Sequence, residues 1–159
     1  MKQRLGIALL AALALCGCAT QYGDMGFTGG VAAQQMTSDT FRILARGNGY
    51  TSASSVQDFM LLKAAETTLG AGGTHFGVIN ERDASSTGAV STPGNAHTSV
   101  IGNTAFTTYT PGEVHTYIMP GQDAFIRVFT ARDGSPLPPG AMSADEIVRF
   151  VGARVKRRA

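Results

Sequence analysis

The order strand, helix, strand between residues 40 and 82 limits the possible folds more than any other feature of the chain. Residues 40–46 (TFRILAR) alternate, with Phe41, Ile43 and Ala45 on one side, which predicts a half-buried strand. Residues 55–69 carry apolar side chains at helical spacing and open with Ser55 and Asp58, a pattern typical of a capping box. Glycines follow this helix, and residues 74–82 (THFGVINER) predict the second strand.

A long uncharged insertion comes next. Residues 84–112 contain no Asp, Glu, Lys or Arg, and Ser and Thr occupy eleven of the twenty-nine positions. Gly102-Asn103 lies between two extended segments, which predicts a hairpin, because Gly-Asn is a common two-residue turn. A disordered loop is the alternative interpretation of the same composition.

The remainder predicts two more strands, at residues 113–119 and 124–130, paired antiparallel through Pro120-Gly121. Ser143 with Glu146 opens a last helix. The predicted fold class is therefore α+β: a small, mostly antiparallel sheet of about four strands with two helices, in the order β-α-β-(insert)-β-β-α.

Residues 1–17 have the layout of a secretory signal, because Lys2 and Arg4 precede an apolar run at residues 5–15. The run is shorter than the roughly 20 residues that a transmembrane helix needs. It ends at Cys16 and Cys18, which could serve as a disulfide, a metal site or a lipid anchor. A Cys-x-Cys pair closes too small a ring for an ordinary disulfide, and no further metal ligands lie nearby.

A lipid anchor at Cys18 is the preferred interpretation. Gly17, a small residue, precedes Cys18, whereas bulky Leu15 precedes Cys16, and lipoprotein signal peptidase requires a small residue before the cut. Cys16 is then removed with the signal. Ala19 in place of Asp favours the outer membrane, with the protein facing the periplasm. The predicted organisation is a signal at 1–17, a lipidated Cys18 with a flexible tether over 18–39, and one domain over 40–156 with the insertion 84–112.

The charge of the chain changes on maturation. The whole sequence has 13 basic and 11 acidic residues, and loss of Lys2 and Arg4 leaves a net charge of zero. Nucleic acid is therefore not an expected partner, since no basic face with interleaved aromatic residues is evident. The basic end at residues 149–158 either compensates a helix dipole or contacts anionic lipid headgroups.

The stretch from Phe41 to Asp83 resembles a family of proteobacterial cell-envelope lipoproteins. The residues that carry the resemblance are the turn Arg46-Gly47-Asn48-Gly49-Tyr50-Thr51 and the helix core Leu61-Leu62-Lys63-Ala64-Ala65-Glu66. The resemblance covers about a quarter of the chain. It implies an envelope lipoprotein and supplies no activity, because the family has none assigned.

Candidate ligand-binding residues are few. His75, His97 and His115 could bind a metal only if the fold brought them together, and their spacing predicts no metal site. The turn at Arg46 and Asn48 precedes a helix and could hold an anion, with Arg46 and Tyr50 as the side chains to test. A strand-to-helix turn that requires positive φ at glycine explains both glycines and is the preferred interpretation.

No catalytic or cofactor motif is evident, so we expect no enzyme activity and no cofactor. Serines lack a Gly-x-Ser-x-Gly elbow, and the carboxylates Asp83, Glu113, Asp123 and Asp133 mark predicted strand ends. The first hypothesis is a membrane-anchored, non-catalytic interaction module whose insertion contacts an envelope protein partner. The second is a small-ligand or metal-binding sensor, which requires His75, His115 and the Arg46 turn to line one site.

Overall fold

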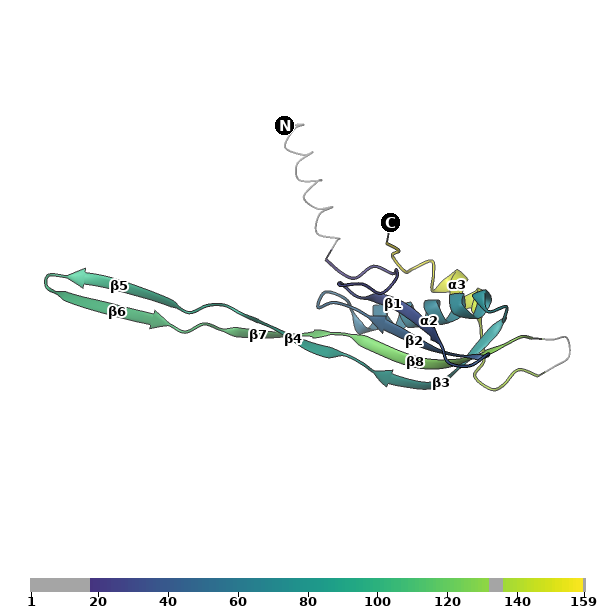
Figure 1. Cartoon of the computed structure of the whole chain (residues 1–159). Helices are drawn as coiled ribbons and strands as arrows, with labels where there is room; N and C mark the ends of the chain where they lie inside the picture. Colours follow the sequence, from purple (N-terminus) through teal and green to yellow (C-terminus); the bar gives the residue numbers. More distant parts are fainter. Residues whose placement is uncertain (1–17, 132–135, 159) are drawn as a thin grey trace, which may run out of the picture.

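The computed structural model describes residues 18–131 and 136–158. Its body is a five-stranded antiparallel sheet in the order β1-β2-β8-β3-β9 (Figure 1). The strands are β1 (Gly30–Gln35), β2 (Thr40–Arg46), β3 (His75–Asp83), β8 (Gly121–Phe129) and β9 (Met142–Ser143). Strands β2 and β3 both pair antiparallel with β8, which lies between them. They therefore run parallel to each other, as two strands joined by a single crossing helix do.

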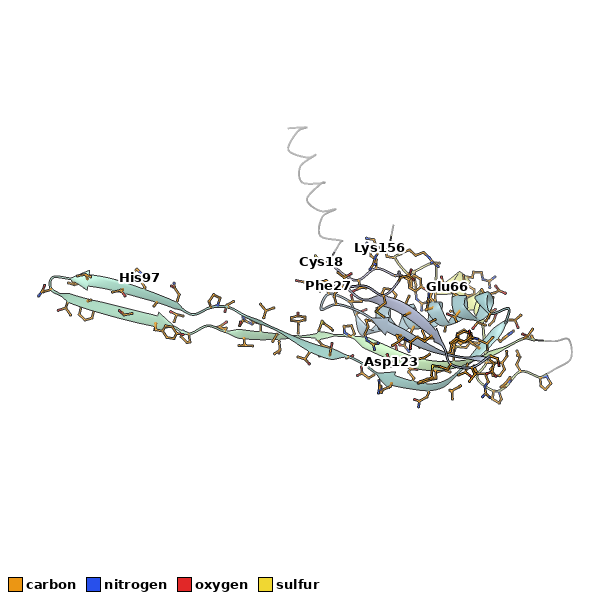
Figure 2. All side chains as sticks on the ribbon, in the orientation of Figure 1. Cys18, Phe27, Glu66, His97, Asp123 and Lys156 are labelled. Carbon is orange, nitrogen blue, oxygen red and sulfur yellow. The ribbon has the colours of Figure 1, made fainter. Side chains whose placement is uncertain are left out.

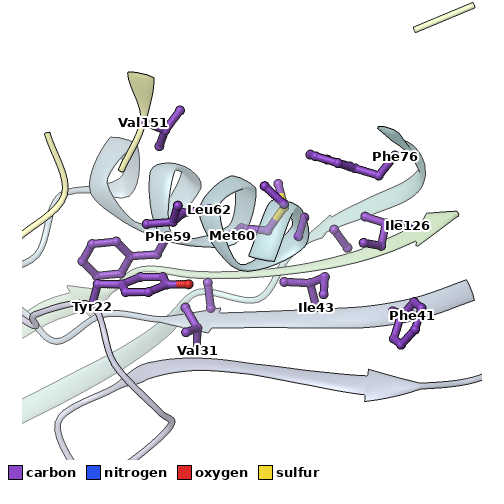
Figure 3. Close-up of a cluster of buried hydrophobic side chains, with 14 of the residues drawn as sticks. Tyr22, Val31, Phe41, Ile43, Phe59, Met60, Leu62, Phe76, Ile126 and Val151 are labelled. Carbon is purple, nitrogen blue, oxygen red and sulfur yellow. The ribbon is translucent and has the colours of Figure 1, made fainter. Parts of the chain in front are cut away.

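Helix α2 (Ala53–Gly70) makes that crossing and covers one face of the sheet (Figure 3). Its N-cap is Ser52, whose hydroxyl accepts a hydrogen bond from the Ser55 amide. The chain turns away after the helix at Gly72, where φ is +77°. This conformation favours glycine because a Cβ would be strained.

The hydrophobic core lies between α2 and the sheet. Alternate residues of β2 and β8 point at the helix, and Ile43, Ala45, Ala124 and Ile126 are fully buried. Small residues on α2 allow the helix to lie close to these strands. The helix contributes these buried side chains: Val56, Phe59, Met60, Leu62, Ala64, Ala65 and Thr68.

The short helix α3 (Ala144–Phe150) packs beside α2 and adds Ala144 to the core. Its N-cap is Ser143, which accepts from the Glu146 amide, as the sequence predicts. The segment after α3 returns to the start of the described chain, where the Tyr22 amide donates to the Lys156 carbonyl at 2.9 Å and Arg158 donates to the Tyr22 carbonyl at 2.8 Å.

Between β3 and β8 the chain leaves the body as a long two-stranded arm, residues 84–120 (Figure 1). The inner ribbon of the arm pairs β4 (Ser86–Ser91) with β7 (Val114–Met119). The outer ribbon pairs β5 (Asn95–Ile101) with β6 (Thr104–Thr110). The same register holds from Asn80↔Phe125 in the body to Ile101↔Thr104 at the tip, with gaps in the pairing between β3 and β4 and between β4 and β5.

The α+β class with two helices and mostly antiparallel strands is confirmed for the described residues. The predicted count of about four strands is too low, because the described residues form nine strands in three sheets. The predicted pairing of residues 113–119 with 124–130 is wrong. Pro120-Gly121 is not a turn there: β7 continues into β8, and each strand pairs with the outgoing chain instead.

The N-terminal segment also differs from its prediction. The sequence predicts a flexible tether over residues 18–39, but Gly30–Gln35 form β1 against β2, and Tyr22 and Val31 are buried. The sequence GVAAQQ of β1 has no alternation of apolar and polar residues, so the strand cannot be recognised from its own residues. It forms because β2 lies beside it. The predicted signal at residues 1–17 lies outside the described residues.

Candidate interaction surface

The arm exposes both faces of a two-stranded ribbon along its length. The outgoing chain from Ala84 to Ile101 has 18 residues, and at about 3.3 Å per extended residue it spans roughly 60 Å. Every residue of β5 and β6 is exposed. The only Asp, Glu, Lys or Arg among residues 84–120 is Glu113. The hairpin predicted at Gly102-Asn103 is confirmed, with φ of +63° at Gly102.

Exposed apolar side chains run along both ribbons of the arm. Phe106 is 56% exposed and Tyr109 is 66% exposed, although aromatic residues of this size usually find cover. The others with large exposure are Val90, Val100, Ile101, Val114, Tyr117 and Ile118. This run of exposed apolar side chains makes the arm a candidate interaction surface.

The two faces of the outer ribbon differ in chemistry. Residues opposite each other in an antiparallel pair share a face. One face is mostly apolar, with Thr98 and Thr107 joined at its centre by a hydroxyl hydrogen bond of 2.9 Å. Its other pairs are Ala96 with Tyr109 and Val100 with Ala105. The opposite face is mostly polar and pairs Asn95 with Thr110, His97 with Thr108, Ser99 with Phe106 and Ile101 with Thr104.

A repeated Thr-Pro-Gly motif separates the two ribbons. Residues 92–94 on the outgoing strand lie against residues 110–112 on the returning strand, and we call this place the joint. A Cβ on Gly112 would lie 2.1 Å from the Thr92 carbonyl oxygen, and one on Gly94 would lie 2.9 Å from that of Thr110. Both glycines are therefore required by the close approach of the two backbones.

Asp123 and three arginines form a charged cluster where the arm joins the body. Asp123 on β8 is only 4% exposed. Its Oδ2 accepts from Arg42 at 2.7 Å and from Arg82 at 3.3 Å, and Arg46 Nη2 lies 2.7 Å from Oδ1. Burial raises the pKa of Asp123, but the guanidinium groups of Arg42 and Arg46 outweigh it, so the pKa lies below its usual range.

The sequence predicts that Asp123 marks a strand end, whereas the structure places it inside β8 and buried. Its partners come from β2 and from β3, which are distant in the sequence, so no local pattern could reveal the pairing. The only local signal is an acidic residue at an alternating position in a strand, opposite Leu44 in the register. The same pairing engages Arg46, one of the predicted anion-binding side chains.

The predicted turn after β2 connects the arm to the N-terminal segment. Asn48 Nδ2 donates to the Cys18 carbonyl at 2.7 Å, and Asn48 Oδ1 accepts from the Tyr50 amide and the Thr51 hydroxyl. A Cβ on Gly49 would lie 2.7 Å from the Tyr117 ring, which also covers Gly88 of β4. Contacts therefore lead from Cys18 through this turn to the base of the arm.

The other predicted site residues do not converge. The Cys18 and Tyr50 side chains are exposed. His75 pairs with Phe129 at the end of the sheet remote from Arg46, and its Nδ1 lies 2.9 Å from the Thr74 hydroxyl. His115 lies on β7 of the arm, 3.3 Å from Glu113, and His97 lies far out on the outer ribbon (Figure 2). The shared site required by the sensor hypothesis is not formed by these residues.

Two arginines of the basic C-terminal segment form ion pairs with helix α2. Arg154 makes two hydrogen bonds to Asp58 of α2, at 2.7 and 2.6 Å, and Arg157 donates to Glu66 at 2.8 Å. Arg157 also lies over the Tyr22 ring, whose hydroxyl donates to Glu66. Lys156 and Cys18 lie on the same side of the body (Figure 2). Compensation by α2 carboxylates thus accounts for two of the five charges.

Comparisons with known proteins give no relative for this chain. No family model matches it, and neither the curated proteins nor the solved structures provide a significant match. Within residues 18–131 and 136–158, no three His, Cys, Asp or Glu side chains are grouped closely enough to hold a metal ion. In the same residues, no helix has the length and apolar character to cross a membrane.

Proposed function

We propose that the chain is a lipid-anchored protein of the cell envelope, held at the outer membrane through Cys18 and facing the periplasm. In this proposal it is not an enzyme and needs no cofactor. It acts as an interaction module, and its arm is the surface that contacts a partner protein of the envelope. The resemblance of residues 41–83 to envelope lipoproteins and the apolar run before Cys18 support the anchor.

The observation that carries the interaction role is the exposure of the arm. Residues 84–112 contribute no side chain to the core, carry no charge and yet hold a regular antiparallel ribbon. An isolated two-stranded ribbon is only marginally stable in water. Such a segment is consistent with a surface that is covered when the protein works, since an uncovered, uncharged edge is an aggregation hazard.

The contacts of Cys18 connect the proposed anchor with the arm. The hydrogen bond from Asn48 to the Cys18 carbonyl and the packing of Tyr117 against Gly49 connect the two in a few residues. A lipid on Cys18 would therefore hold the membrane close to the base of the arm. We therefore propose that the arm works at a fixed position relative to the membrane surface.

Mass spectrometry of the protein purified from membranes tests the anchor. We expect the mature chain to begin at Cys18 and to carry a diacylglyceryl thioether, and we expect Cys18→Ser to remain uncleaved. An unmodified Cys18 in the wild type would contradict the anchor and would leave the arm to be tested separately.

Site-specific photo-crosslinking tests the interaction role. A photoreactive amino acid replaces Phe106 on the arm, and a matched variant carries it at Gln34 on the body, where the side chain is also exposed. We expect protein adducts from position 106 and none from position 34. Equal adducts from both positions, or none from either, would contradict the arm as the contact surface.

A further inference from the structure

The outer ribbon has two free edges of equal length. Strands β5 and β6 have seven residues each and pair only with one another, so each leaves one row of backbone N–H and C=O groups without a strand beside it. Both strands are bounded by the same Thr-Pro-Gly motif on one side and by the Gly102-Asn103 turn on the other. An edge of one copy therefore matches an edge of a second copy in length.

These edges lack the usual protection against pairing. Natural edge strands carry charged residues, proline or bulges that prevent contact between copies. The outer ribbon has no Asp, Glu, Lys or Arg, its prolines lie outside β5 and β6, and its register has no shift. Protection of this kind is present on the body, where β3 has a free edge beyond its short pairing with β9 and carries Glu81, Arg82 and Asp83 there.

The absence of charge also narrows the choice of partner. A partner recognised by charge would require a complementary charge on the arm, and residues 84–112 offer none. A second copy of an uncharged edge meets no repulsion, and backbone hydrogen bonds supply the contact. Anchoring of all copies in one membrane raises their effective concentration, which favours such an association.

We propose that the arms of two copies of this chain pair edge to edge, so that two outer ribbons form one continuous sheet with the apolar sides of Tyr109 and Val100 on a shared face. This inference rests on the proposed function, because it names the partner of the same arm. Pairing doubles the number of strands beyond the marginal two. It also covers half of the free edges of each ribbon.

Disulfide crosslinking of the full-length protein in native membranes tests this pairing. Thr98 is the central residue of β5 and Thr107 that of β6. A two-fold antiparallel pair of β5 edges places Thr98 beside Thr98 of the second copy, and a pair of β6 edges does the same for Thr107. Ser38→Cys, exposed at the opposite end of the sheet, reports random collisions, and the wild type reports any reaction of Cys18.

We expect Thr98→Cys or Thr107→Cys to form a dimer on oxidation, or the two variants to form a mixed dimer when expressed together if β5 pairs with β6. Lysines are then added at both ends of the strand that carries the cysteine, as Asn95→Lys with Ile101→Lys on β5 or Thr104→Lys with Thr110→Lys on β6. In each antiparallel pairing the end of one edge strand lies opposite the end of the other, so like charges face each other and we expect loss of the dimer. The uncharged changes Asn95→Gln with Ile101→Leu, or Thr104→Ser with Thr110→Ser, should retain it.

Three results separate this inference from the proposed function. Dimers no more abundant than those of Ser38→Cys would overturn self-pairing. Adducts of the arm with a different protein would also overturn self-pairing but would leave the interaction module standing. No adduct of any kind, here and in the photo-crosslinking, would overturn both proposals.

Discussion

Asp123 shows how a single residue fixes the base of the arm. Asp123 lies within β8, and its carboxylate forms ion pairs with Arg42 on β2 and Arg82 on β3, the two strands that flank β8. Arg42 and Arg46 are each 33% exposed, so water screens part of the attraction. The cluster joins three strands just before two of them leave the body.

We expect Asp123→Asn to lower the free energy of unfolding by about 1–3 kcal/mol, because it removes charge-assisted hydrogen bonds at a buried atom. Urea unfolding measures the loss. Asp39→Asn, which removes a half-exposed ion pair with Arg127, serves as the control and should cost less. Equal losses in the two variants would contradict the role of burial at Asp123.

The difference in stability between the wild type and Asp123→Asn should depend on pH. The pKa of Asp123 is lowered in the folded protein, so its contribution is present above the unfolded pKa of about 4 and is lost as the pH falls through the folded value. The difference in stability between wild type and Asp123→Asn should therefore be largest near neutral pH and should shrink in acid. A difference that grows on acidification would show that the pKa is raised instead.

At the scale of elements, helix α2 begins at a residue that the sequence pattern does not select. The pattern predicts Ser55 as the cap, but Ser52 accepts from the Ser55 amide at 3.1 Å. We expect Ser52→Ala to cost about 1 kcal/mol of stability and Ser55→Ala to cost less, since the latter retains its amide donor. Thermal unfolding compares the two, and a larger loss for Ser55→Ala would move the cap to Ser55.

The base of the arm depends on one aromatic contact. Tyr117 of β7 covers Gly88 of β4, and a Cβ on Gly88 would lie 2.4 Å from Cζ of the ring. We expect Tyr117→Ala and Gly88→Ala each to accelerate amide hydrogen exchange in β4 and β7 without changing β2 or β8. Tyr109→Ala on the outer ribbon is the control. Acceleration that also reaches β2 would mean that the inner ribbon and the body unfold together.

The sequence predicts the elements whose patterns are local. Strand β2, helix α2, strand β3, the cap of α3 and the Gly102-Asn103 hairpin follow from alternation, apolar spacing and turn chemistry. Strand β1 and the continuation of β7 into β8 do not, because the first lacks a period and Pro-Gly occurs both in turns and in extended chain. The buried Asp123 and the Tyr117 contact depend on residues that meet only in the fold.

At the scale of the whole molecule, the body contains the hydrophobic core, and the arm is exposed. All core side chains come from outside residues 84–120. We expect replacement of residues 93–112 by an Asn-Gly turn between Thr92 and Glu113 to change the free energy of unfolding by less than about 0.5 kcal/mol. The two ends already meet, because the Thr92 amide donates to the Glu113 carbonyl at 2.8 Å.

Calorimetry and photo-crosslinking of this shortened protein, with the photoreactive group moved to the exposed Ile118, give the comparison. We expect an unchanged melting temperature and the loss of adducts that depend on the outer ribbon. A large drop in melting temperature would show that the outer ribbon stabilises the body, and would contradict a core that depends on the body alone.

The joint has a consequence for how the arm can change in length. In a paired ribbon, inserting one residue into one strand turns every following side chain to the opposite face. At the joint the regular pairing stops after Ser91↔Val114 and resumes at Asn95↔Thr110. An odd insertion there can be absorbed before the next pair, so the outer ribbon can be lengthened or exchanged while the register at Tyr117 and Asp123 stays as it is.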